Sequence, residues 1–276
     1  MKDCIKLDYL ANNDRLVAFS TTRHGGQSKG AYASMNVNHY CGDRMEDVEA
    51  NKVLLCNHLR IDDKHLVMPH QIHHTQVRVV TPEMLNLDAR VRKTLLNGVD
   101  ALVTGEAGIC IGVSTADCIP VLLHDDVNHV VAAIHAGWRG TLANIVNRTV
   151  DTMILNFGTN PQQMEAFIGP GISVEKFEVG DEVYEQFSLA GFDMERIAHR
   201  YDKWHIDLKR CNQLQLEQLG VSRQRIKVSP ICTYSRNEDF FSARRQGPLC
   251  GRIFSGIMMK RKYKEVGKSS TSFHVL

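Results

Sequence analysis

Three short segments of this chain place reactive side chains directly after apolar, strand-like runs. Residues 69–74 include His73, residues 114–120 include Asp117 and Cys118, and residues 133–140 include His135. Two imidazoles and one thiolate are a recognised zinc ligand set, in which water or substrate takes the fourth position. The same side chains also suit a hydrolase in which a cysteine nucleophile is activated by a histidine base.

The spacing of these residues does not decide between the two kinds of site. Cys118 follows His73 by 45 positions and precedes His135 by 17, which matches no structural zinc finger, so a metal site here would be of the open, catalytic kind. His73 and His74 are neighbours, and in a strand only one of them needs to face a site. An aspartate such as Asp117 is rarely buried in a core unless a polar or charged group pairs with it.

The third segment runs from a strand through Ala136 and Gly137 into a helix that begins near Trp138. Free N–H groups in the first turn of a helix favour an anion, and Arg139 adds a positive charge in the same place. Taken alone, this pattern is also what an ordinary tight turn requires. We therefore treat the segment as a candidate phosphate contact that depends on its neighbours.

The elements around these segments indicate an α+β fold. Strands are expected at residues 17–20, 75–81, 101–104, 109–115, 120–124, 130–135 and 252–259. The four runs between residues 100 and 136 are separated only by turn residues, which predicts one contiguous, mainly antiparallel sheet.

Three helices are predicted from apolar residues at helical spacing. One runs from about Glu46 to Leu59, and a second runs from Trp138 until Gly158 ends it. The third follows Asp207, which suits an N-cap, and ends at Gly220; it places Cys211 in the core.

The composition is that of an ordinary globular protein that can bury a core without disulfides. The 276 residues are 43% hydrophobic and 23% charged, with a net charge of +2. The charge pattern indicates no nucleic-acid partner, and the basic stretch Lys260, Arg261, Lys262 and Lys264 is interpreted as a solvated tail. The sequence has no signal-peptide core and no apolar run long enough for a membrane span, so we expect a cytoplasmic protein with eight reduced cysteines.

The chain resembles the YfiH-like family, which comprises the laccase-domain or polyphenol-oxidase-like purine nucleoside phosphorylases. The agreement is ordered and runs from residue 17 to about residue 260. It is carried by residues 21–28, 35–38, 71–73, 115–121, 135–141, 168–172, 177–180, 232–234 and 240–245.

The resemblance implies one catalytic domain over residues 1–276, with layered mixed or antiparallel sheets flanked by helices in an αββα sandwich. It implies zinc on His73, Cys118 and His135, although copper could share these ligands. It also implies phosphorolysis of inosine, guanosine and adenosine to base and ribose 1-phosphate. Deamination of adenosine and phosphorolysis of methylthioadenosine are expected as side activities.

Several residues are then candidates for the chemistry. Asp117 would either carry a proton during the reaction or orient its neighbour Cys118, and the sequence favours neither role over the other. Phosphate contacts are assigned to Arg139, Lys52 and Arg244.

Asn36 and Gln71 are expected to position the substrate, and Tyr234 either stacks on the base or is a plain core residue. The chain departs from the family pattern at Lys52, where relatives usually carry Arg, and at Ala243, where an aromatic residue is usual. Both departures concern substrate preference more than the metal site.

Three other functions stay open on the sequence. One is copper-dependent phenol oxidation, although a laccase-type copper cluster needs more histidines than this set supplies. Another is an editing enzyme acting on a precursor of peptidoglycan. The third is a non-catalytic binding protein stabilised by zinc, which requires a fourth ligand such as Cys232 or His74. The oligomeric state does not follow from the sequence.

Overall fold

The central strands of the chain are buried on both faces. In the computed structural model, which describes residues 5–261, all residues of β6 (Cys110–Thr115), β7 (Ile119–Asp125) and β8 (Val130–Ala136) are buried. Such strands must lie between two covering layers. The predictions for Lys262 and Lys264 fall outside the described residues.

Two sheets form the middle layers of the molecule, and both are mixed. The six-stranded sheet has the order β13 (Ile226–Val228), β9 (Glu165–Ile168), β7, β8, β5 (Ala101–Thr104), β4 (Val77–Val79). The five-stranded sheet has the order β1 (Leu7–Asn12), β2 (Leu16–Thr21), β14 (Ile253–Met259), β6, β3 (Leu66–Val67). Pairs β13–β9, β4–β5 and β3–β6 are parallel and the others antiparallel.

The prediction of one contiguous sheet over residues 100–136 is wrong. β5, β7 and β8 share the six-stranded sheet, whereas β6 pairs with β14 and β3 in the other sheet. The chain therefore changes sheets twice, before and after β6. Turn signals mark where a strand ends, but they do not say whether the next strand pairs in the same layer.

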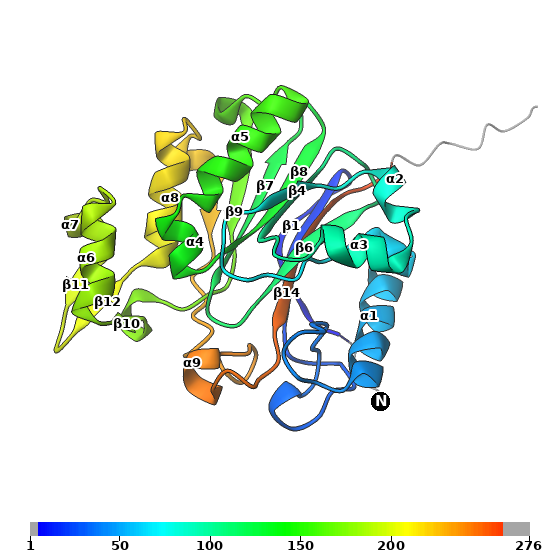
Figure 1. Cartoon of the computed structure of the whole chain (residues 1–276), viewed down its shortest axis with the longest axis horizontal. Coiled ribbons are helices and arrows are strands. Elements are labelled where there is room, and N and C mark those ends of the chain that lie inside the picture. Colours follow the sequence, from blue (N-terminus) through cyan, green and yellow to red (C-terminus); the bar gives the residue numbers. More distant parts are fainter. Residues whose placement is uncertain (1–4, 262–276) are drawn as a thin grey trace, which may run out of the picture.

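The two sheets pack face to face, and helices cover their outer faces (Figure 1). Alternate residues such as Leu122 and Ala133 meet Ile111 and Ile257 of the other sheet. The helical cover of the six-stranded sheet includes α5 (Ile145–Phe157) and α8 (Leu208–Gln218), and α1 (Met45–Leu59) covers the five-stranded sheet. The layered α+β prediction is thereby confirmed.

The remaining elements are short. A three-stranded sheet, β10 (Glu178–Val179), β12 (Trp204–Ile206) and β11 (Ala198–Arg200), lies beside α6 (Asp181–Leu189) and α7 (Met194–Ile197). The other helices are α2 (Pro82–Leu85), α3 (Ala89–Leu95), α4 (Trp138–Leu142) and α9 (Ala243–Gln246). Turns of 3-10 helix occupy Gly30–Tyr32, Asp63–His65, Pro161–Gln163, Val174–Lys176 and Arg223–Arg225. No helix within residues 5–261 is long and apolar enough to cross a membrane.

The helix boundaries follow the predicted capping residues, with one exception. The side chain of Asp207 accepts a hydrogen bond from the Arg210 N–H at the start of α8, as expected. The helix predicted from Trp138 to Gly158 is instead two helices, α4 and α5. Asn144 separates them because it adopts a left-handed conformation with φ of 60°, which asparagine tolerates better than most residues.

Candidate metal centre

The alternation of side chains along β8 directs His135 toward the space between the two sheets. Val131 and Ala133 face the five-stranded sheet, and His135 has the same parity at the end of the strand. Asp100 immediately precedes β5, whose Ala101 pairs with Ile134 of β8, so the acid lies beside His135. The ends of β5, β7 and β8 thus meet at one end of the sandwich.

His73, Cys118 and His135 come together at this place. Their donor atoms all lie within 4.8 Å of one another, and the rings of His73 and His135 meet edge-on with centroids 4.7 Å apart. His135 is buried, Cys118 is partly exposed and His73 is exposed, so the cluster opens to solvent on the His73 side. Within residues 5–261 this is the one group of three or more His, Cys, Asp or Glu side chains that could hold a metal ion.

Asp100 fixes the orientation of both histidine segments. Its Oδ1 accepts a hydrogen bond from His135 Nδ1 at 2.7 Å and another from the His73 N–H at 2.9 Å. Its Oδ2 accepts from the N–H groups of Ile72 and His74. These bonds hold His73 in a turn with φ of 63°, and not in the strand that we expected.

The bond to Asp100 also sets the tautomer of His135. With Nδ1 bonded to Asp100, Nε2 is the nitrogen that faces the cluster, and it is the atom that would bind a metal ion once its own proton has left. A carboxylate behind a histidine in this way is the usual second partner of a metal-ligating imidazole. The donor set and its support therefore fit a metal ion.

Gly137 has no side chain, and this leaves room for the three candidate ligands to lie close together. A Cβ atom at this position would lie 3.0 Å from Cys118 Sγ, 3.0 Å from His73 Cδ2 and 3.8 Å from His135 Nε2. The φ of Gly137 is −68°, so the backbone conformation itself accepts other residues. The glycine is thus required by the close approach of the ligands and not by a turn.

The electrostatics of the cluster favour a thiolate. Burial alone would raise the pKa of the Cys118 thiol, but His135 and His73 outweigh it and lower that pKa to about 6. Burial would likewise lower the pKa of His135, whereas Cys118 and Asp100 raise it to about 9. A thiolate is the form of cysteine that binds metals.

Asp117 joins the turn that contains Cys118 to a distant loop and to the helix α9. Its φ is 88°, its Oδ1 accepts a hydrogen bond from Thr233 Oγ1 at 2.8 Å, and its Oδ2 accepts from the Arg244 N–H at 2.7 Å. Asp117 is nearly buried. Among the described contacts, neither carboxylate oxygen bonds to His73 or His135.

The three cations predicted to bind phosphate lie in different settings. Arg139 is exposed at the start of α4, four residues after His135, and its guanidinium lies 4.2 Å from the ring centroid of Trp138. The guanidinium of Arg244 donates to the carbonyls of Lys176 and Glu178. Lys52 lies on α1, where it pairs with Glu49 and Asp63.

The predicted positioning residues are held by the protein itself. The Gln71 amide bonds to both the N–H and the carbonyl of Ser114, which fastens the His73 loop to the end of β6. Asn36 is fully buried and donates to Asp43. The ring of Tyr234 is half-buried, with the cationic groups of Lys176 and Arg245 within 6 Å of its centroid.

Sequence reasoning did not single out Asp100, and it assigned no contact with the site to Gly137 or Thr233. A signal for Asp100 existed, because an acid between Val99 and the apolar strand Ala101–Thr104 is out of place in a core unless it is partnered. Gly137 was noted as a small residue at a strand-to-helix junction, but its closeness to Cys118 and His73 depends on the tertiary fold.

The fourth ligand that a closed zinc site requires is absent from the cluster in the described part of the chain. Cys232 Sγ accepts a hydrogen bond from the Ser173 N–H, and His74 is exposed. Neither belongs to the group that could hold a metal. The three-ligand arrangement is that of an open site.

Comparison with known proteins finds relatives over nearly the whole chain. A family described as "Multi-copper polyphenol oxidoreductase laccase" matches residues 17–260. A purine nucleoside phosphorylase of Bacteroides thetaiotaomicron is 45% identical over 94% of this chain and 98% of its own length. The protein named adenosine deaminase RL5, from an unknown prokaryotic organism, is 40% identical over 92% of this chain and 98% of its own.

A solved structure has the same fold. The crystal structure of the hypothetical protein YfiH from Bacillus licheniformis superposes with a TM-score of 0.83 at 29% identity, covering 89% of this chain and 93% of that one. Relatives named as enzymes support an enzyme here as well. The chain belongs to the laccase-like YfiH family.

Proposed function

We propose that this chain is a zinc-dependent purine nucleoside phosphorylase of the cytoplasm, with one catalytic domain over residues 1–276. Its substrates would be inosine, guanosine and adenosine with phosphate. Adenosine deamination and methylthioadenosine phosphorolysis would be side activities. The single observation that carries the proposal is the open cluster of His73, Cys118 and His135, with Asp100 fixing His135 for ligation. The names of the relatives supply the substrate class.

A zinc ion on these residues would act as a Lewis acid toward a substrate oxygen or would lower the pKa of a water molecule. In phosphorolysis the bond between the purine and C1′ of the ribose breaks and a phosphate oxygen bonds to C1′. The proton of hydrogenphosphate then leaves with the base. The chain must hold phosphate on one side of the sugar and the base on the other.

Arg139 is the best phosphate contact among the three predicted cations. It follows the ligand His135 by four residues, and no described carboxylate pairs with it. Its planar guanidinium can bind two phosphate oxygens at once. We give Lys52 a lesser role because Glu49 and Asp63 already occupy its ammonium group.

The base would lie against the loop that follows Asp117. Thr233 and Arg244, which bond to Asp117, bring Tyr234 and α9 to the cysteine side of the cluster. Tyr234 would then stack on the purine, and Arg244 would border it. Since both carboxylate oxygens of Asp117 have partners, we assign this residue to positioning Cys118, and not to proton transfer.

The alternative functions have less support. Copper-dependent phenol oxidation by a multicopper cluster needs additional histidine groups, and residues 5–261 contain a single three-ligand group. A zinc-stabilised binding protein would need the fourth ligand that this group lacks. An enzyme that edits a peptidoglycan precursor would bind the nucleotide part of its substrate at the same metal centre, and it would differ from a phosphorylase in the product that it forms.

Turnover of inosine with and without phosphate tests the reaction. The proposal predicts hypoxanthine and ribose 1-phosphate in equal amounts, formed only when phosphate is present, and inosine from adenosine in a slower side reaction. Product formation would be followed by chromatography, with a phenol as a parallel substrate. Phosphate-independent hypoxanthine release, or phenol oxidation without nucleoside cleavage, would refute it.

A further inference from the structure

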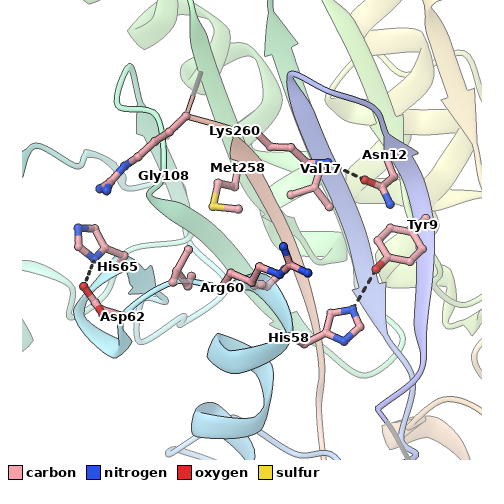
Figure 2. A pocket seen from close by; sticks show the side chains of 13 residues that line it. Tyr9, Asn12, Val17, His58, Arg60, Asp62, His65, Gly108, Met258 and Lys260 are labelled. Atoms are coloured by element: carbon pink, nitrogen blue, oxygen red, sulfur yellow. Dashed lines mark hydrogen bonds and ion pairs between the residues drawn. The ribbon is translucent and has the colours of Figure 1, made fainter. Parts of the chain in front are cut away.

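A cavity lies at the end of the five-stranded sheet that is far from the metal centre. It has a volume of about 760 Å³ and is bordered by β1, β2, the end of β14 and the segment that follows α1 (Figure 2). Its lining residues are Tyr9, Asn12, Val17, His58, Leu59, Arg60, Ile61, Asp62, His65, Gly108, Met258, Lys260 and Arg261.

The cavity is separate from the metal centre. On β14, Ile253 pairs with Thr115, three residues before Cys118, whereas Met258 lies five residues farther along the strand. At about 3.3 Å per residue, this step alone is about 17 Å. The cavity also shares no lining residue with the cluster of His73, Cys118 and His135.

The inner wall of the cavity is apolar. Val17 and Met258 are paired across β2 and β14 and are both nearly buried, and Leu59 and Ile61 continue the surface. Tyr9 stands at the side and is 44% exposed as a residue, and its hydroxyl is hydrogen-bonded to His58 Nε2 at 3.0 Å. An exposed ring held in place beside an apolar wall suits a flat, apolar group.

The rim of the cavity is strongly positive. The lining includes the cations Arg60, Lys260 and Arg261 and a single acid, Asp62, whose Oδ2 lies 3.7 Å from His65 Nδ1. In Figure 2 the side chain of Arg60 extends across the middle of the view, between the Asp62–His65 and Tyr9–His58 pairs. Among residues 5–261 no carboxylate forms an ion pair with Arg60, Lys260 or Arg261.

The local partners of these cations leave donors available. Lys260 Nζ donates to Asn12 Oδ1 at 2.9 Å, which holds it at the rim, and an ammonium has two further N–H groups. Arg261 bonds to the Ala107 carbonyl through Nε. At the end of α1, the carbonyls of Asn57 and Cys56 accept from the backbone N–H groups of Arg60 and Ile61, so these two carbonyls do not need the Arg60 side chain. Lys260 and Arg261 are therefore part of a built cavity, and not only of the solvated tail that we expected.

We propose that this cavity binds a small organic phosphate. The phosphate would lie among Arg60, Lys260 and Arg261, and an aromatic or apolar portion would lie against Val17 and Met258 beside Tyr9. Guanidinium groups bind phosphate oxygens through paired, charge-assisted hydrogen bonds, and an apolar wall adds affinity for the attached group. This site is independent of the phosphorylase proposal and would exist in a chain with any activity at the metal centre.

The test is calorimetric titration of the full chain at low ionic strength with AMP as the probe. Adenosine, titrated into Cys118→Ala so that turnover at the metal centre adds no heat, is the phosphate-free control. Three variants are compared: Arg60→Gln with Lys260→Gln, Cys118→Ala, and Arg148→Gln as a control at an exposed arginine on α5. We expect one AMP site whose affinity is unchanged in Cys118→Ala and in Arg148→Gln. In the double variant it falls at least about tenfold, because two charged contacts are lost.

Nucleoside turnover and the thermal midpoint of the double variant should match those of the unaltered chain. If the double variant unfolds, Arg60→Gln alone serves, since Arg60 is exposed and has no ion-pair partner among residues 5–261. Binding that is lost in Cys118→Ala but kept in the double variant would assign AMP to the metal centre and overturn the proposal. Absence of saturable AMP binding at millimolar concentration would overturn it as well.

Discussion

Asp100 accepts a hydrogen bond from Nδ1 of His135 at 2.7 Å, and the same carboxylate accepts the backbone N–H groups of residues 72–74. One buried acid therefore orients two of the three candidate ligands, which lie on segments more than sixty residues apart. Asp100 therefore fixes the position of the turn that carries His73 relative to the strand end that carries His135, as a metal site requires.

The variant Asp100→Asn should weaken zinc binding by about 10- to 100-fold. The amide keeps the volume of the carboxylate but loses its charge, and its NH₂ group cannot accept from His135 or from a backbone N–H. Zinc affinity would be measured by competition with a chromophoric chelator. Asp125→Asn is the matched control, because Asp125 is also buried and accepts backbone N–H groups, in the turn after β7. Equal zinc affinity in the Asp100→Asn variant and the unaltered chain would contradict the assigned role.

Gly137→Ala should impair zinc binding and turnover without a comparable loss of stability. The added Cβ would come within 3.0 Å of Cys118 Sγ and of His73 Cδ2, so the ligands would have to move apart. Gly140→Ala, in the helix α4 that Gly137 precedes, is the control, because its Cβ would approach no atom closer than 3.4 Å. Zinc content, inosine turnover and thermal midpoint would be measured together. Full zinc occupancy and full activity in Gly137→Ala would show that the close approach is unimportant.

Arg139→Ala should raise the KM for phosphate by about tenfold or more and leave zinc content unchanged. The exposed guanidinium beside Trp138 is the cation that we place on the phosphate. Arg148→Ala removes an exposed arginine from α5 and should leave the KM unaltered. An unchanged phosphate KM in Arg139→Ala, with only the nucleoside KM affected, would move the phosphate elsewhere.

Lys209 gives a stability prediction that depends on pH. Burial lowers the pKa of Lys209 from an ordinary value near 10.5 to about 8, although its ammonium donates to the carbonyls of Ser229 and Ile231. Between pH 8 and 10.5 the unfolded chain binds the proton and the folded chain does not, so the folded state gains stability as pH rises. Below about pH 8 both states are protonated and this contribution is constant.

Lys209→Met removes the ionisable group and serves as the reference. From pH 8 to 10.5 the free energy of unfolding of the unaltered chain should rise relative to that of the variant, by at most about 3 kcal/mol. Denaturant unfolding at several pH values measures this difference. A difference that stays constant or falls over this range would show that Lys209 does not titrate as the burial implies.

The sequence predicted the candidate ligands and many of the strands because both depend on local patterns. The apolar run through His135 marked the end of β8, and the run before Cys118 marked the end of β6 at Thr115. Asp207 and Gly158 marked helix ends. Strand pairing depends on contacts between distant residues. β6 lies beside β14, so that Thr115 pairs with Ile253. No turn residue near Thr115 indicates which strand β6 pairs with.

The supporting residues of the site were harder to foresee for the same reason. His73 was expected in a strand, but hydrogen bonds from its turn to Asp100, 27 residues away, hold it at positive φ. Asp117 drew attention as the neighbour of Cys118, yet the acid that contacts the histidines is Asp100. Adjacency in sequence is a poor guide to which acid lies behind a ligand, because the partner comes from a neighbouring strand.

The most direct test of the metal centre is the zinc content of the purified chain and of Cys118→Ala, measured by elemental analysis on protein prepared without added metal or chelator. Cys211→Ala, at a buried cysteine of α8, is the control. We predict close to one zinc per chain, with phosphate-dependent inosine turnover, in the unaltered protein and in the control. Cys118→Ala should lose both. A Cys118→Ala protein that retains full zinc and full turnover would contradict the assignment of the site.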